Sequence, residues 1–62
     1  MPLTDEQKET LKMRRLTILE TRIFELEMDR AGAVAAGEEN AVVQIDEKVR
    51  KLKLAVEAIE KM

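Results

Sequence analysis

Two stretches of the chain carry apolar residues at alternating intervals of three and four positions. The residues that recur in this way are, in the first stretch, Leu16, Leu19, Ile23 and Leu26 and, in the second, Val42, Ile45, Val49, Leu52, Val56 and Ile59. They occupy the a and d positions of consecutive heptads, which is typical of the buried stripe of an amphipathic helix. The pattern therefore predicts two helices and an all-α protein.

The start of the first helix is marked by a capping box. Thr4 is the predicted N-cap residue, and Gln7 stands three positions later, where its side chain can return to the Thr4 backbone N–H. Asp5 and Glu6 then fall in the first turn, where the helix dipole favours negative charge. We expect the helix to begin at this point.

The region between the two stripes contains both glycines of the chain. Gly37 is expected to end the first helix in the left-handed conformation that glycine adopts readily. Glu38 and Glu39 would then open the second helix, with Asn40 as an alternative N-cap. The prediction is a helix over about 4–33, a turn over about 34–39 and a helix over about 40–61.

The two apolar stripes are out of phase, so a continuous coiled coil would need a break in register near the glycines. Folding the chain back removes this difficulty. Leu26 then lies opposite Ile45, and at the far end Lys12 lies opposite Ile59. We therefore predict one domain over residues 1–62, a coiled-coil-like antiparallel helical hairpin.

Such a hairpin is short of core. A domain of this size buries only about 60% of the surface that its unfolded chain exposes. The sequence has no Cys for disulfides, which leaves oligomerisation as the way to add stability. We predict a homodimer in which two hairpins form a four-helix bundle.

Two further columns of residues are candidates for that association. The first helix carries a bulky column beside its stripe, and the second helix carries a small one, so that the large column of one copy would pack on the small column of another. The residues are Met13, Phe24, Met28 and Ala31 in the large column and Ala41, Ala55 and Met62 in the small column. The alternative is that they only widen the stripe of a single hairpin.

Reactive groups are scarce. The chain has no His, Cys, Ser, Tyr or Trp, which excludes Ser-His-Asp and Cys-His nucleophilic schemes and removes the main ligands of zinc. Glu20 and Glu27, between the columns of the first helix, are the candidates for acid–base work. A simpler interpretation is that both reach solvent or pair with a basic residue. We predict no enzymatic activity, no cofactor and no metal site.

Charge is abundant but nearly balanced, with 39% charged residues and a net charge of −2. The pairs Asp46–Arg50 and Glu47–Lys51 have the i,i+4 spacing that favours contact on a helix. The basic residues around Lys48 are spread over most of the helix circumference and interleaved with acids. The sequence therefore does not favour nucleic-acid binding, which needs a basic face, and this function is kept as an alternative.

Some apolar residues lie outside the stripes. Leu11 and Ile18 share one side of the first helix, and Val43 and Leu54 share one side of the second. One hypothesis is that they dock a helix of another protein. The alternative is that isolated exposed apolar residues are ordinary.

These observations favour a non-enzymatic protein-interaction or regulatory protein that associates with itself. The alternatives are an RNA-binding four-helix bundle and a small structural subunit or assembly factor of a larger complex, such as a phage particle. The architecture resembles in shape the plasmid copy-number hairpins that bind RNA as four-helix bundles, and the resemblance implies no function for this chain. The start of the chain lacks the pattern of a signal peptide, and no apolar run has the length of a membrane span, so we expect a cytoplasmic protein.

Overall fold

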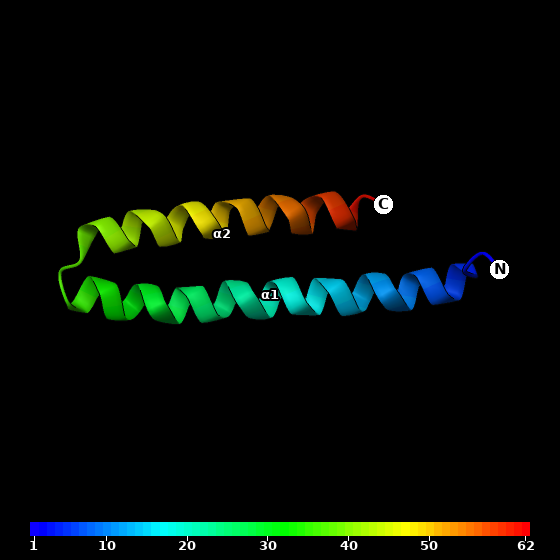
Figure 1. Cartoon of the computed structure of the whole chain (residues 1–62), viewed down its shortest axis with the longest axis horizontal. Helices are drawn as coiled ribbons and strands as arrows, with labels where there is room; N and C mark the ends of the chain where they lie inside the picture. The colour runs from blue at the N-terminus through cyan, green and yellow to red at the C-terminus, as the bar shows by residue number, and fades with distance from the viewer.

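The computed structural model describes residues 1–62 and contains two helices that pack against each other as an antiparallel hairpin. Helix α1 covers Asp5–Ala35 and helix α2 covers Glu39–Glu60. Figure 1 shows them side by side, with both termini at one end and α1 extending past the end of α2. The predicted all-α hairpin is confirmed, and the molecule is a rod with extents of 52 × 15 × 15 Å.

The capping box at the start of α1 is present. The Gln7 backbone N–H donates to the Thr4 hydroxyl at 3.0 Å, and the Thr4 backbone N–H donates to the Gln7 side-chain oxygen at 2.9 Å. Each bond satisfies a backbone donor that the first turn of a helix leaves without a partner. The sequence pattern therefore located this helix start within one residue.

The turn is built around Gly37, the residue with a positive φ, of 70°. Its backbone N–H donates to the Val34 carbonyl oxygen at 3.1 Å, and that of Glu38 donates to the Ala33 carbonyl oxygen at 2.9 Å. This pair of bonds is the Schellman motif, which needs a left-handed residue at the position of Gly37. The role predicted for Gly37 is confirmed.

Helix α2 begins without a side-chain cap. Its N-cap residue is Glu38, whose side chain makes no capping hydrogen bond, and Asn40 lies inside the first turn of the helix. The alternative of Asn40 as the N-cap is therefore wrong. The Schellman motif brings the chain out of α1 so tightly that α2 has already begun at Glu39.

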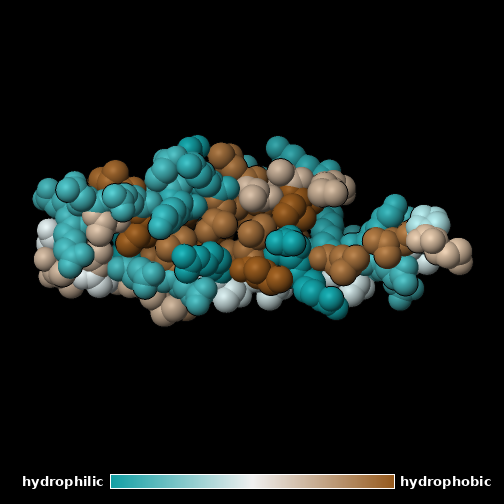
Figure 2. Space-filling view, in the orientation of Figure 1, coloured by the Kyte–Doolittle hydropathy of each residue, from teal (hydrophilic) through white to brown (hydrophobic).

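The core is as thin as the sequence suggests. Only Leu26 and Ala33 are buried, with 3% and 8% of their surface exposed. The other residues along the line where the helices meet, which we call the seam, are half-buried: Lys12, Leu16, Leu19, Ile23, Val42, Ile45, Val49, Leu52, Val56 and Ile59. Figure 2 shows hydrophobic residues gathered in a band along the two helices, only partly covered by hydrophilic ones.

Two ion pairs lie on the surface of the hairpin. Asp46 accepts a hydrogen bond from Arg30 of the other helix at 2.7 Å. Arg50 pairs with Glu47, one turn earlier, at 2.6 Å. The predicted ion pairs Asp46–Arg50 and Glu47–Lys51 are absent. Arg30 binds Asp46 across the seam, and Arg50 binds Glu47.

Neither helix is both long enough and apolar enough to span a membrane.

Candidate functional site

The large column of α1 is open to solvent. Met13, Phe24 and Met28 have 54%, 60% and 54% of their surface exposed, and Ala31 is exposed as well. None of the four packs into the seam. The hairpin therefore leaves its only aromatic side chain on the outside.

The small column of α2 lies beside the seam. Ala41 and Ala55 are half-buried, and each directly precedes a seam residue, Val42 and Val56 respectively. Met62, at the end of the chain, is almost fully exposed. The two alanines are small residues 14 positions apart on this line, and Lys48 stands midway between them.

The outer apolar residues do not form one surface. Leu11 lies at the open end of the hairpin, in a pocket with Ile59 and Met62, whereas Val43 lies at the turn, in a pocket with Ala33. Ile18 and Leu54 line no pocket and are exposed on different helices. The structure thus separates the candidate partner-binding residues into the two ends of the molecule and its middle.

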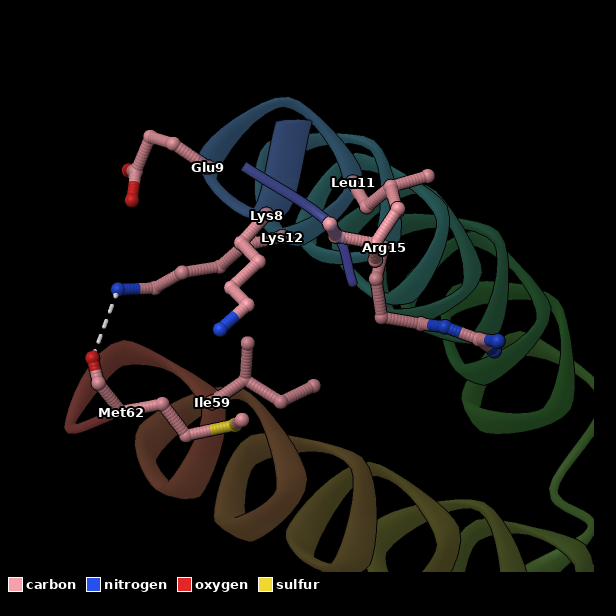
Figure 3. Close-up of a pocket in the computed structure, with 8 residues that line it drawn as sticks. Lys8, Glu9, Leu11, Lys12, Arg15, Ile59 and Met62 are labelled. Carbon is pink, nitrogen blue, oxygen red and sulfur yellow. Dashed lines mark hydrogen bonds between the residues drawn. The ribbon is translucent and has the colours of Figure 1, made fainter. Parts of the chain in front are cut away.

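The open end has its own arrangement of apolar and basic groups. Figure 3 shows the side chains of Lys8 and Lys12 reaching from α1 toward the last residues of α2. The Lys12 Nζ donates to the Met62 backbone carbonyl oxygen at 3.4 Å, and Ile59 lines the same pocket of about 440 Å³. The predicted approach of Lys12 to Ile59 is confirmed, since the lysine stem covers this last apolar layer.

Basic side chains gather along one side of the seam. Arg22 of α1 and both Lys48 and Lys51 of α2 line one open pocket of about 270 Å³ over Leu26 and Leu52. No acidic residue lines this pocket, and none of the three cations forms an ion pair. The pKa of Glu47 is lowered by the hydrogen bond from Arg50 and also by the positive charge of Lys51, so a neighbouring acid still offsets part of this basic cluster.

The same line of cations continues along α1. Arg15 and Lys8 precede Arg22 by one and two heptads, so they lie on the same side of the helix, and neither forms an ion pair. We call the side that carries these five residues, Lys8, Arg15, Arg22, Lys48 and Lys51, the basic side. Asp29, the next residue in the heptad series, ends the line near the turn.

Acidic side chains lie on the opposite side of the seam. A step of two residues turns about 200° around a helix, so Asp46 and Lys48 flank the seam on opposite sides, as do Glu20 and Arg22. Glu27 lies one heptad after Glu20. We call the side that carries Glu20, Glu27, Asp46 and Glu60 the acidic side, on which Lys53 is an exception.

The electrostatics of this acidic side are dominated by one contact. The hydrogen bond from Arg30 holds the pKa of Asp46 below its ordinary value, and the positive charge of Arg30 acts in the same direction. Glu20 and Glu27 are exposed, form no ion pair and line no pocket. The structure gives neither carboxylate the enclosed surroundings that acid–base catalysis requires.

No group of three or more His, Cys, Asp or Glu side chains is arranged to hold an ion. What the arrangement offers is surface: two columns of apolar residues, bordered by charges of opposite sign.

Sequence reasoning overlooked this separation of charge, although one signal was available. Lys8, Arg15 and Arg22 repeat at heptad spacing on a single line of α1. Lys48 and Lys51 join that line only after the chain folds back, and this step depends on the register between the helices.

Comparison with known proteins finds no matching family model, no matching curated protein and no matching solved structure.

Proposed function

We propose that the chain is a non-enzymatic protein-interaction protein that works by self-association, with two hairpins joining as a four-helix homodimer. The observation that carries this proposal is the exposure of Phe24, Met13 and Met28 in a molecule that buries only Leu26 and Ala33. A hairpin that exposes more large apolar side chains to solvent than it buries has an incomplete core.

The energetic reason for association is the burial of those side chains. Burying a Phe or Met side chain fully contributes about 1.5–3 kcal/mol. The large column supplies three such side chains, and the small, half-buried Ala41 and Ala55 would leave room beside them for a bulky side chain of another copy. The pairing of a large and a small column supports a second copy of the chain as the partner.

The proposed absence of catalysis is supported by the chemistry of the side chains. The sequence has no His, Cys, Ser or Tyr to serve as a nucleophile or a neutral-pH base. Its unpaired carboxylates Glu20 and Glu27 stand in open solvent. The interaction surface, and not a pocket, is therefore the proposed functional site.

The direct test is sedimentation equilibrium of the full chain over a range of concentrations, with helicity measured by circular dichroism on the same samples. Wild type is expected to be helical and to associate to a dimer or a larger assembly, and Phe24→Glu is expected to be a helical monomer at the same concentrations. Leu54→Glu is the matched control, since Leu54 is also about half exposed but belongs to neither column. A wild-type monomer at every concentration would contradict the proposal.

A second candidate function is nucleic-acid binding, which the basic side favours. Arg22, Lys48 and Lys51 are unpaired and close enough to line one pocket, as contacts to consecutive phosphates require. The basic side lacks aromatic residues on which bases could stack, because the single aromatic residue of the chain, Phe24, belongs to the large column next to the acidic side. We therefore rank this function second. A gel-shift titration with a short RNA duplex at low salt tests it.

A further inference from the structure

The hairpin presents opposite charges on the two sides of its seam, and each side also carries one apolar column. The small column, with Ala41 and Ala55, borders the basic side, since Lys48 stands one heptad from each alanine. The large column starts on the acidic side at Met13 and passes between Glu20 and Glu27 at Phe24. The side with the small apolar residues is therefore the basic one, and the side with the large apolar residues is the acidic one.

We propose that the partner is a second copy of this chain, docked with its acidic side on the basic side of the first copy. This inference rests on the self-association proposed above and specifies which surfaces meet. Phe24 of one copy then lies against the small column of the other, next to Ala41 or Ala55, which stand 14 residues, about 21 Å, apart along α2. Glu20 and Glu27, which have no partners in the single hairpin, meet the unpaired Arg22, Lys48 and Lys51.

The charges decide against the more common symmetric arrangement. In a two-fold symmetric dimer each copy contributes the same surface. That geometry would place basic side on basic side, or acidic side on acidic side, and like charges brought together at an interface cost several kcal/mol. Only the pairing of unlike sides brings the unpaired cations next to the unpaired carboxylates.

The dimensions of the hairpin suit such an interface. The rod is 52 Å long and 15 Å wide, and both helices are present along the 22 residues of α2, about 33 Å of that length. A stable protein–protein contact buries roughly 800 Å² on each partner, and a rod of this size has to use most of one side to reach that area. Docking along the full length of the side therefore meets the requirement, whereas end-to-end contact does not.

The use of two different surfaces has a consequence for the size of the assembly. After two hairpins have joined into four helices, one copy still presents a free basic side and the other a free acidic side. Contacts of this kind continue until a ring closes or an open stack forms. The assembly therefore grows beyond the dimer as the concentration rises, and it weakens as salt screens the charges.

Two charge-reversal variants test the pairing. The basic-side variant is Arg22→Glu/Lys48→Glu, which replaces two of the five cations of the basic side by carboxylates. The acidic-side variant is Glu20→Lys/Glu27→Lys, which replaces two of the four carboxylates of the acidic side by cations. All four residues are exposed, so both variants are expected to keep the helicity of wild type. The control is Lys61→Glu, which changes the net charge half as much as the basic-side variant and lies one heptad after Leu54, on the outer line of α2 that belongs to neither column.

Sedimentation velocity is measured for each variant alone and for an equimolar mixture of the two. We expect each variant alone to self-associate at least about tenfold more weakly than wild type, the control to match wild type, and the mixture to recover complexes. Raising NaCl from about 50 mM to about 500 mM is expected to dissociate wild type.

The failures of the two proposals are distinct. If wild type is a monomer under all conditions, the proposed self-association fails, and with it this inference. If wild type associates but both variants associate equally well alone, self-association stands and the pairing of unlike sides is wrong. If the basic-side variant keeps full self-association and instead loses binding to a short RNA duplex, the basic side serves nucleic acid and the inference is again overturned.

Discussion

The two ends of the hairpin are held together in different ways. At the turn, Ala33 is buried, Gly37 closes the Schellman motif and Arg30 pairs with Asp46 across the seam. At the open end no residue is buried, and one hydrogen bond of 3.4 Å, from the Lys12 Nζ to the Met62 carbonyl oxygen, connects the helices. Stability is therefore graded along the rod, from well packed at the turn to loosely joined at the termini.

Tolerance to substitution should differ between the two ends in the same way. Near the turn a substitution removes contacts that nothing else replaces, whereas near the termini α1 extends past α2, so that its first turn has no packed neighbour to lose (Figure 1). Stabilities have to be compared at one protein concentration, because association adds to apparent stability.

Leu26→Ala is expected to have the largest effect. Leu26 is the most buried side chain, and truncating a buried leucine costs about 2–5 kcal/mol. Urea denaturation followed by circular dichroism measures the loss. Leu11→Ala at the open end is the matched control and should change the free energy of unfolding much less, because Leu11 is largely exposed. Equal losses for the two variants would refute the graded packing.

Gly37→Ala comes next. A Cβ at this position meets nothing within 4 Å, so the cost is the left-handed backbone alone, about 1–2 kcal/mol. Gly32→Ala is the matched comparison: its Cβ also meets nothing within 4 Å, but Gly32 lies inside α1, where alanine is favoured by about 1 kcal/mol. Opposite shifts in the urea midpoint are expected, and a loss of stability in both variants would contradict this explanation.

Thr4→Ala removes the cap of α1 at the open end. Loss of an N-cap costs about 0.5–2 kcal/mol in general, and we expect the lower part of that range because the first turns of α1 do not pack on α2. Amide hydrogen exchange should show faster exchange over the first turn and unchanged exchange near Leu26. Faster exchange along the whole of α1 would mean that the open end supports the rest of the hairpin.

Asp46→Asn is expected to have the smallest effect, because the ion pair with Arg30 is solvent-exposed. The pair lowers the pKa of Asp46, so its contribution is present above the ordinary value of 3.8 and disappears as the pH falls through the lower value of the folded state. The small difference in stability between wild type and the variant should therefore vanish in strongly acidic solution. A difference that grew on acidification would show that the sign is wrong.

The sequence predicted the fold where the signal was local. Thr4 and Gln7 located the helix start, Gly37 located the turn, and the heptads named the residues of the seam, because caps, turns and periodicity each depend on a few neighbouring residues. The end of the turn was harder, since Glu38 takes the N-cap position without a capping bond.

Contacts between side chains were predicted less well. Arg50 pairs with Glu47 and not with Asp46, because Arg30 of the other helix binds Asp46. For the same reason the basic side was missed: Arg22 and Lys48 are far apart in sequence and meet only through the register of the hairpin. The exposure of Phe24 follows from its place outside the heptad stripe, one position after Ile23.

The tight turn at Gly37 also bears on the order in which the hairpin forms. Contacts beside the turn join residues close in sequence, such as Arg30 and Asp46, which are 16 positions apart, whereas Lys12 and Met62 are 50 positions apart. Because the entropy of closing a loop grows with its length, the contacts next to the turn form at the lowest cost and each new layer shortens the loop for the next. Folding should therefore start near Gly37 and proceed layer by layer toward the termini. The open end should form last and unfold first.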